Sequence, residues 1–275
     1  MSTSKIKNIV IAVLIFINLF FLAVLTISSA GEAAEHHRIL DDLRMVFTEN
    51  GIGLPESLPG SLLSMKTLET ERDAFGEASA ARAVLGDCSP SGEGGANSVY
   101  TGARGTAEFN ARGELKIELT EPYTPRGGSA AAVAKRLLRD MGIDAAAPTI
   151  HENDEITTAV AICEYKGVPM FNCSVSFEFN KAGALLRVTG RRPTGIKEAP
   201  QDRLRDLPTA LLGFLTFTRA GGADCTELIS VAAAYRLTVS AFGDGTLSPG
   251  WLITTDAGVY FIDALMGEIV TADAP

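Results

Sequence analysis

The feature that most constrains this chain is a long apolar run near its start. The run extends from Ile9 to Ile27, and its only polar residues are Asn18 and Thr26. As an α-helix that rises ~1.5 Å per residue, it reaches about 28 Å, close to the roughly 30 Å hydrocarbon core of a bilayer. The apolar part of a secretory signal is shorter, about 7–15 residues. The length therefore predicts a transmembrane anchor that places residues 9–27 in the lipid bilayer.

The charges that flank the run predict its orientation. Lys5 and Lys7 precede it, and the nearest charges after it are the acidic residues Glu32 and Glu35. Lys and Arg beside a membrane segment stay on the cytoplasmic side. We therefore expect a single-pass protein of the cell membrane, with a cytoplasmic N-terminus and an extracytoplasmic part that begins after about residue 30.

Small residues at the end of the run leave a second interpretation open. Ser28, Ser29 and Ala30 are of the kind that signal peptidases accept, and cleavage after Ala30 would release the remainder of the chain. The length of the run favours the retained anchor over this alternative.

Asn18 lies near the middle of the apolar run. An amide at this depth is costly unless it finds a hydrogen-bond partner, which is often on another transmembrane helix. An Asn is also tolerated in the anchor of a single-pass protein, so both interpretations stand. Asn18 is therefore a candidate contact between transmembrane helices.

Composition excludes one class of function and leaves the cysteines open. The net charge is −9 and no basic cluster is present, so binding to nucleic acid is not expected. Cys88, Cys163, Cys173 and Cys225 match no zinc-binding spacing. Outside the membrane they can be oxidised, and four cysteines allow 3 disulfide pairings. The alternative is that they are buried thiols, which a domain of this length favours because it needs no disulfide.

Beyond the membrane segment, the spacing of apolar residues predicts four helices. The caps at their ends support these predictions, because Ser and Asp cap helix N-termini and Gly ends helices. The helices are expected within residues 32–51, with Ile39, Leu40, Leu43, Val46 and Phe47 on one stripe; within 68–86, ending at Gly86; after Ser129, with Val133, Leu137, Leu138 and Met141 on one stripe; and after Asp206, ending at Gly221.

Groups of strands are predicted after these helices. The clearest is "FNCSVSFEF", in which Phe171 to Phe179 alternate with polar residues, as expected of an antiparallel strand with one wet face. We expect it to pair with "ITTAVAICEY" through a turn at Lys166–Gly167. Other strands are expected in "SVYTG", "GTAEFN", "GELKIELTE", "ALLRVTGR", "ELISVAAAYRLTVS" and "GWLITTDAGVYFIDALMGEIV", with a tight turn at "GDG".

Helices that precede groups of antiparallel strands indicate an α+β fold. The predicted fold is one transmembrane helix followed by extracytoplasmic units of helix plus antiparallel sheet, in a pattern that recurs three times. The predicted domains are 1–30, the cytoplasmic N-terminus and anchor; 31–126, a membrane-proximal α+β domain; and 127–275, a distal α+β domain made of the units 127–200 and 201–275.

A search for chemistry in the sequence assigns no catalytic, cofactor-binding or metal-binding residues. The segment "HENDE" places His151 among three acids, but it lacks the spacing and the glycine of a calcium loop, so a solvated loop is expected. His36 and His37 are neighbours and point about 100° apart on a helix, which makes them poor joint ligands. Cys173 is predicted on a buried face, without the histidine partner that a cysteine nucleophile needs. We therefore expect a protein that is not an enzyme.

Several segments together resemble the YycI-type proteins of Gram-positive bacteria. The resemblance is carried by "KIKNIVIAVLIFINLFFLAVL", "RILDDLRMVFTENGI", "VPMFNCSVSFEF" and "SPGWLITTDAGVYFIDALMGEIV", with an aromatic residue after a Ser-Pro pair (Ser248-Pro249-Gly250-Trp251) and a Tyr-bearing strand (Val259-Tyr260-Phe261). Small β-units of PepSY type share such patterns.

The resemblance to YycI-type proteins implies a regulatory function. It implies a membrane-anchored accessory protein that works with a YycH-like partner. Together the two would adjust a WalK-type sensor histidine kinase, partly through contacts between transmembrane helices. The kinase belongs to a two-component system that governs cell-wall metabolism. Two alternatives remain: a PepSY-like extracytoplasmic binding or inhibitory module that the anchor merely tethers, and a hydrolase whose site the motif search does not find.

Overall fold

The chain divides into two compact units, Met1–Leu54 and Pro55–Pro275. The computed structural model describes residues 38–59, 65–91, 97–124, 128–200, 203–240 and 244–272. Residues 9–27, the predicted anchor, lie outside this part of the chain, as do Lys5, Lys7, Asn18 and Gly243 of the predicted "GDG" turn, whereas the strands on either side of that turn pair antiparallel as a hairpin requires. Among the helices of the described ranges, none combines the length and the apolar character that crossing a bilayer requires. The predicted domain boundaries stay predictions.

In the first unit, residues 38–49 form a helix. Its buried residues, Leu40, Leu43 and Phe47, follow the expected helical stripe. The helix ends as predicted at Gly51, whose positive φ of 76° is accessible to glycine without strain. Ile39, which was predicted on the same stripe, is 36% exposed, because it lies about 100° around the helix from Leu40.

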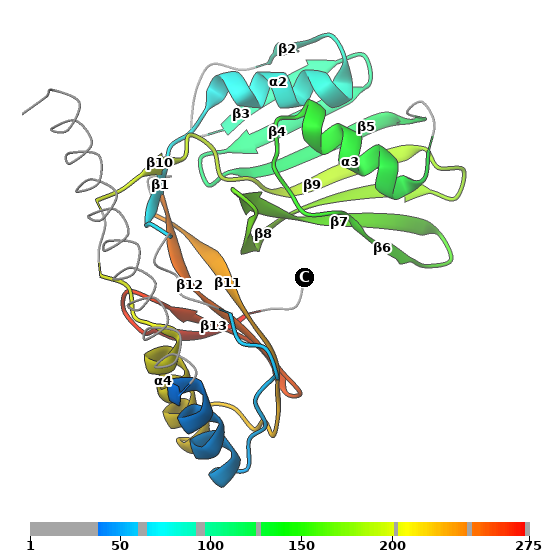
Figure 1. Cartoon of the computed structure of the whole chain (residues 1–275). Coiled ribbons are helices and arrows are strands. Elements are labelled where there is room, and N and C mark those ends of the chain that lie inside the picture. Colours follow the sequence, from blue (N-terminus) through cyan, green and yellow to red (C-terminus); the bar gives the residue numbers. More distant parts are fainter. Residues whose placement is uncertain are drawn as a thin grey trace, which may run out of the picture. The chain divides into compact units, whose positions relative to one another are not determined.

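The second unit is mixed α+β and is dominated by one large sheet with few helices (Figure 1). The fourteen strands of the described ranges form a single hydrogen-bonded sheet. In chain order its elements are β1 (Leu68–Thr70), α2 (Ala74–Leu85), β2 (Cys88–Pro90), β3 (Asn97–Gly102), β4 (Gly105–Asn110), β5 (Glu114–Tyr123), α3 (Ala130–Asp140), β6 (Thr149–Glu152), β7 (Ile156–Tyr165), β8 (Val168–Asn180), β9 (Leu185–Arg191), β10 (Lys197–Glu198), α4 (Leu207–Arg219), β11 (Leu228–Val239), β12 (Gly245–Thr255), β13 (Gly258–Asp263) and β14 (Ile269–Ala272).

The start of α2 differs from the sequence prediction, which began a helix near Leu68. The Asp73 side chain accepts a hydrogen bond from the backbone N–H of Gly76 and caps the helix there. Leu68 instead pairs with both β10 and β12 as part of β1. Strand β2 is a second difference, because Cys88–Pro90 is not among the strands expected from the sequence, yet it pairs with β3. Both short strands depend on partners that local sequence does not reveal.

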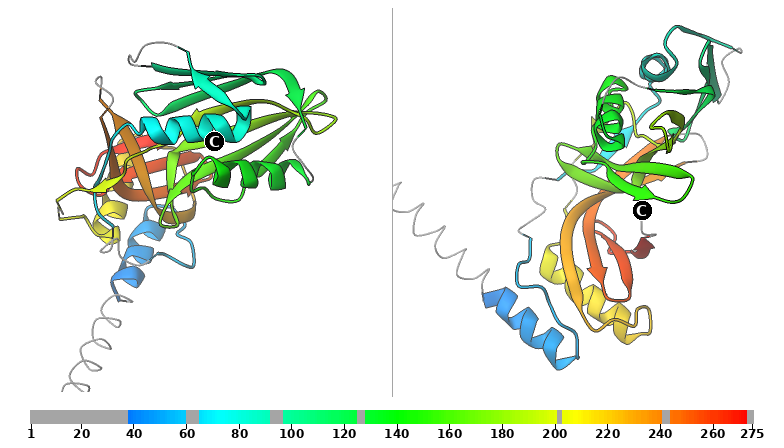
Figure 2. Two further views of the ribbon diagram at one scale, coloured as in Figure 1. Left: turned by 90° about the horizontal axis from the view of Figure 1, so that it is seen from above. Right: turned by 90° about the vertical axis from the view of Figure 1, so that its right-hand side faces the viewer.

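One half of the sheet is built from two groups of strands in mirrored order. Its strands follow the order β2-β3-β4-β5-β9-β8-β7-β6, with all neighbours antiparallel. Helices α2 and α3 lie side by side against one face of this half (Figure 2). The predicted cap Ser129 and the buried stripe of α3 are confirmed, as is the turn at Lys166–Gly167 between β7 and β8.

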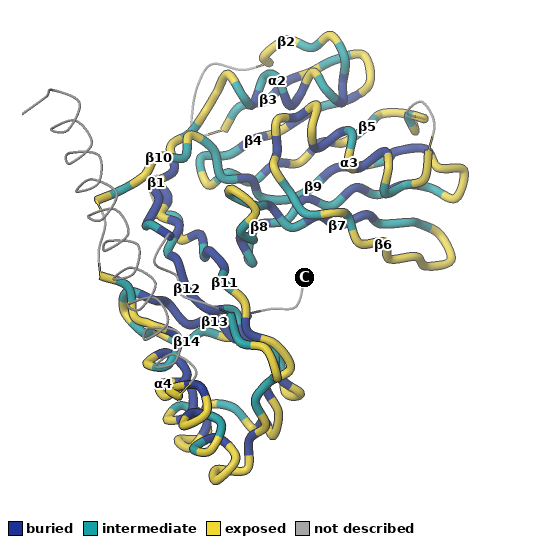
Figure 3. Tube along the Cα trace, viewed as in Figure 1, coloured by how far each residue is buried: buried dark blue, intermediate teal, exposed yellow. Residues whose placement is uncertain are grey.

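The other half contains β10-β1-β12-β11, and β13 and β14 extend it from β12. Strand β12 is largely buried, whereas β11 mixes buried and exposed residues (Figure 3). Helix α4 begins at the predicted cap Asp206 and packs on β13 through Phe214, whose ring centroid lies 5.3 Å from that of Tyr260. Trp251 of β12 is fully buried.

Strand β8 joins the two halves. It pairs antiparallel with β7 from Val168 to Asn180 and with β9 from Val175 onward. In addition, its Met170 pairs in parallel with Tyr235 of β11. Beside this point the Asn172 side chain continues the ladder: its Nδ2 donates to the carbonyl of Leu237 at 2.8 Å, and its Oδ1 accepts from the N–H of Leu237 at 2.9 Å. A side-chain amide thus takes the place of a backbone amide between the halves.

We predict that Asn172→Ala destabilises the protein, because it leaves both backbone groups of the buried Leu237 without partners. Each unsatisfied buried group costs about 1–3 kcal/mol. Ser176→Ala, on the same half-buried face of β8, is the matched control and is expected to change the free energy of unfolding by no more than about 0.5 kcal/mol. Urea unfolding of the full chain in detergent, followed by Trp251 fluorescence, measures both. Equal effects of the two substitutions would contradict the bridging role.

All four cysteines are free thiols in this structure. Cys163, Cys173 and Cys225 are buried, and Cys88 is half-buried. Burial raises the pKa of the Cys163 and Cys173 thiols to about 12. Since the thiolate is the reactive form, the two buried thiols of β7 and β8 are inert at neutral pH.

We predict that iodoacetamide labels Cys88 first in the native protein near pH 8. Cys163 and Cys173 should stay unlabelled until the fold is opened with urea, because their raised pKa leaves almost no thiolate. Mass spectrometry of digests taken over time gives the order. Labelling of Cys163 at the rate of Cys88 in the folded protein would show that this part of the core is open.

Candidate functional site

The site residues that the sequence singled out are not brought together by the described fold. Asn18, Lys5, Lys7, His36 and His37 lie outside the described residues. His151 and Glu152 are solvent-exposed as expected, but they lie on the edge strand β6 and not in the predicted loop, because they pair with β7. In the turn that follows, the Asn153 side chain accepts from the N–H groups of Glu155 and Ile156, which shapes the loop. Within the described ranges, no group of three metal-ligand side chains forms.

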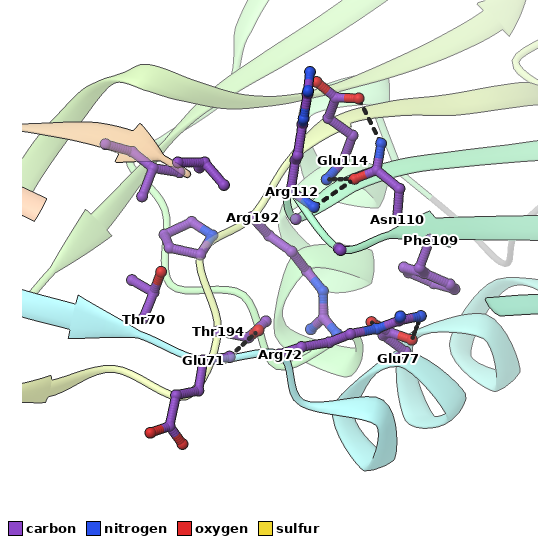
Figure 4. A pocket seen from close by; sticks show the side chains of 15 residues that line it. Thr70, Glu71, Arg72, Glu77, Phe109, Asn110, Arg112, Glu114, Arg192 and Thr194 are labelled. Atoms are coloured by element: carbon purple, nitrogen blue, oxygen red, sulfur yellow. Dashed lines mark hydrogen bonds and ion pairs between the residues drawn. The ribbon is translucent and has the colours of Figure 1, made fainter. Parts of the chain in front are cut away.

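The polar region that the fold does assemble lies where the two halves of the sheet meet (Figure 4). Two chain segments cross between the halves there, residues 71–73 before α2 and residues 192–196 after β9. They are fastened to each other by Thr194, whose Oγ1 donates to the carbonyl of Glu71 at 2.9 Å and accepts from the N–H of Asp73 at 3.3 Å. The N–H of Glu71 in turn donates to the carbonyl of Thr194 at 3.1 Å.

A partly buried ion pair stands at the start of α2. Arg72 Nε donates to Glu77 Oε1 at 2.8 Å and Arg72 Nη2 donates to Glu77 Oε2 at 3.2 Å, a two-pronged geometry. Arg72 Nη2 also donates to Ser98 Oγ. The Glu77 side chain is only 5% exposed, and its hydrogen bond raises the pKa of Arg72. Glu77 stands in the first helical turn, where the helix dipole favours a negative charge.

A second polar cluster forms at the turn between β4 and β5. Asn110 Oδ1 accepts from the N–H groups of Arg112 and Glu114, and its Nδ2 donates to the Glu114 carboxylate. Arg191 on β9 pairs with Glu114 directly across the sheet. Hydrogen bonds from Arg191 and then Asn110 lower the pKa of Glu114. This cluster ties the β4–β5 turn to the end of β9.

Arg192 lies between these two clusters and has an unusual environment. It is buried, with 5% of its surface exposed, and its guanidinium carbon lies 5.7 Å from the centre of the Phe109 ring. Its Nη2 is buried and has no hydrogen-bond partner among the described residues. Figure 4 shows the side chain reaching from the segment after β9 toward the first turn of α2, beside the Arg72–Glu77 pair.

Arg192 forms part of the wall of two cavities. The small cavity, about 20 Å³, is the space that Figure 4 draws between Thr70–Arg72, Asn110–Glu114 and Arg192–Thr194, and it has room for about one water molecule. The large cavity, about 280 Å³, lies among Asp73, Gly142–Asp144, Cys163–Tyr165, Met170 and Arg192–Ile196. Its size suits a small molecule.

The sequence reasoning missed Arg192 altogether. The only local signal is a pair of arginines that ends a strand before a proline, in "RRPTG". Arg191 ends β9, is half-buried and pairs with Glu114, whereas Arg192 follows the strand and is buried. The sequence pattern does not indicate which of the two arginines is paired. The Arg192 guanidinium supplies a fixed positive charge among polar residues. Proteins commonly use such a charge to bind a small anion.

We predict that Glu77→Ala lowers the free energy of unfolding by about 3 kcal/mol, because it removes the buried carboxylate that holds the Arg72 guanidinium through two hydrogen bonds. At about 2–4 °C per kcal/mol, the melting temperature should fall by roughly 6–12 °C. Glu118→Ala is the matched control, since Glu118 pairs with Lys116 at 3.1 Å with both side chains about half exposed. It should cost about 0–1 kcal/mol. Thermal unfolding followed by the single tryptophan, Trp251, measures both, and similar losses for both variants would refute the prediction.

No family model matches this sequence, and no curated protein matches it. Among solved structures, an uncharacterized protein from Eubacterium rectale matches with a TM-score of 0.45 and 12% identity, over 76% of this chain and 86% of that chain. The YpeB C-terminal domain of Bacillus megaterium matches with a TM-score of 0.39 and 13% identity, over 74% of this chain and 99% of that chain. Similarity at this level carries no argument about function, and the resemblance to YycI-type proteins stays a prediction.

Proposed function

We propose that this chain is a single-pass membrane protein that modulates a WalK-type sensor histidine kinase together with a YycH-like partner. The observation that carries the proposal is the apolar run from Ile9 to Ile27, with Lys5 and Lys7 before it and a large α+β body after it. The body is extracytoplasmic in this proposal, and the N-terminus is cytoplasmic. The protein acts in a two-component system that governs cell-wall metabolism, as the resemblance to YycI-type proteins implies.

The transmembrane helix is the working element of this proposal. A protein shifts the equilibrium of a kinase only by as much as its contacts differ in free energy between the two kinase states. Asn18, in the middle of the run, supplies such a contact through a hydrogen bond to another helix in the bilayer. The proposal assigns no catalytic, cofactor-binding or metal-binding residue to the chain and no nucleic-acid partner.

A second candidate function places the activity in the body. It is a PepSY-like extracytoplasmic binding or inhibitory module for which the anchor is only a tether. The large cavity, whose wall includes Arg192, favours it, because its volume of about 280 Å³ gives a small ligand room.

We predict that Asn18→Leu weakens co-purification with the kinase from membranes about threefold to thirtyfold. This range corresponds to about 0.6–2 kcal/mol for an interhelical hydrogen bond in lipid. Thr26→Leu, at the other polar position of the run, is the matched control and should have no effect. Quantitative immunoblotting of the captured kinase gives the ratio.

Replacing residues 9–27 with an unrelated transmembrane helix separates the two candidates. Under the first, phosphorylation of the response regulator by the kinase should return to the level of cells that lack this protein. Regulation that survives the replacement but is lost when residues 55–275 are removed would refute the first candidate and favour the tethered module. A mature protein that begins at Gly31 would refute the first candidate as well.

A further inference from the structure

The second unit contains one structural motif three times. In each copy a helix precedes four strands that pair antiparallel in chain order. The copies are repeat A (α2 with β2 to β5), repeat B (α3 with β6 to β9) and repeat C (α4 with β11 to β14). Each helix also begins in the same way, because the side chain of Asp73, Ser129 or Asp206 accepts from a backbone N–H three residues later.

Repeats A and B complete each other. The fourth strand of repeat A, β5, pairs antiparallel with the fourth strand of repeat B, β9. Both strands therefore lie in the interior of the sheet, and the strand order of repeat B mirrors that of repeat A. Helices α2 and α3 lie side by side on the same face (Figure 2). Two copies of this motif thus join through their fourth strands.

Repeat C has no such neighbour among the described strands. Its fourth strand, β14, pairs with β13 alone in the described ranges. In that ladder the N–H of Asp263 donates to the carbonyl of Glu268 at 2.9 Å. Because hydrogen-bonded and non-hydrogen-bonded pairs alternate along antiparallel strands, the backbone groups of Ile269 and Thr271 point away from β13. Strand β14 therefore presents an open edge to any further strand.

This edge lacks the features that discourage strand pairing. Proteins protect sheet edges with charged residues or proline. Four strands end the branches of the described sheet, and three of them carry such residues: β2 contains Pro90, β6 ends at the exposed Glu152, and β10 consists of Lys197 and Glu198. Strand β14 has the sequence Ile-Val-Thr-Ala, without charge or proline. Of these four strands, β14 is the one suited to accept another strand.

The helix of repeat C is likewise suited to a neighbour. Helix α4 packs on β13, the strand beside β14, through Phe214 and Phe217. The exposed residues of its first three turns are all uncharged: Thr209, Leu212, Gly213 and Thr216. Leu212 is 45% exposed. Helix α3, by contrast, exposes Lys135 and Arg139. An uncharged helix surface beside an open strand edge matches the arrangement through which α2 and α3 adjoin in repeats A and B.

We propose that repeat C pairs with repeat C of a second copy of this chain, through antiparallel pairing of the two β14 strands. In this dimer the two β14 strands take the places that β5 and β9 hold between repeats A and B, and the two α4 helices lie side by side. Identical antiparallel strands are related by a two-fold axis, so the interface is closed and self-complementary. A second copy is the expected occupant, because the motif joins its own kind where the structure shows it joined. The inference goes beyond both candidate functions and depends on neither.

Sedimentation velocity of the full chain in detergent micelles tests the pairing, and we expect dimers. Thr271→Pro should raise the dissociation constant of the dimer about tenfold or more, because proline removes the outward N–H and leaves the hydrogen bonds to β13 in place. Thr271→Val is the matched control. It keeps the N–H and the β-branched shape, so it should leave the dissociation constant within about twofold.

Cross-linking identifies the surface, because contacts between the predicted transmembrane helices would also produce a dimer. The background is the full chain in micelles with Cys88→Ser and Cys225→Ser. In it, Thr271→Cys should give a covalent dimer with a short bismaleimide. Ser230→Cys, at an exposed position of β11, is the matched control and should give none. Strand β11 is the first strand of its repeat, and the first strands of repeats A and B, β2 and β6, stay at the edge of the sheet.

Four results would overturn the proposal. They are a full chain that sediments as a monomer at every concentration, equal dissociation constants for Thr271→Pro and Thr271→Val, cross-linking through Ser230→Cys but not through Thr271→Cys, and a cross-link of Thr271→Cys in cells to a different protein in place of a second copy. If Thr271→Pro does not fold, as judged by Trp251 fluorescence, the two cysteine variants decide.

Discussion

The pairing of β8 with both halves of the sheet is the constraint on which the rest of the body depends. One long strand is shared: β7 pairs with it along its length, Met170 also pairs with β11, and its residues from Val175 onward also pair with β9. At the point of change the Asn172 side chain supplies the hydrogen bonds that a neighbouring backbone would otherwise make with Leu237. Because buried backbone groups must be paired, this amide fixes where the second half begins. The segments at 71–73 and 192–196 cross between the halves beside it, and that crossing creates the polar region around Arg192.

Charge is concentrated at this crossing rather than spread through the core. Glu77 and Arg72 satisfy each other and Ser98, and Glu114 is held by Arg191 and Asn110. Arg192 stands between the two groups without a partner of its own in the described chain. Burying a charge is tolerated only where pairing or a ligand compensates it, so the unpaired guanidinium distinguishes this region from an ordinary structural ion-pair cluster. The inert thiols of Cys163 and Cys173 show the contrasting case, in which burial keeps an ionisable group neutral.

Much of the fold was predictable because its signals are local. Alternation along residues 171–179, the caps Ser129 and Asp206, and the turn at Lys166–Gly167 each depend on neighbours in sequence, and each is confirmed. Leu68–Thr70 was predicted as helix and is a strand, because its pairing partners stand more than a hundred residues away in β10 and β12. The candidate site was not predictable for the same reason: nothing in "RRPTG" distinguishes the paired Arg191 from the unpaired Arg192.

The sequence by itself determined the features that need only a segment and its solvent. The apolar length of residues 9–27, the lysines before it and the position of Asn18 follow from the match between helix rise and bilayer thickness, and they remain the basis of the anchor prediction. The helix-and-strand pattern likewise follows from local periodicity. Tertiary structure decided which strands share a sheet, which short segments become strands, and which arginine is left without a partner. Those outcomes depend on burial and on hydrogen bonds between residues that are distant along the chain, and no local pattern encodes them.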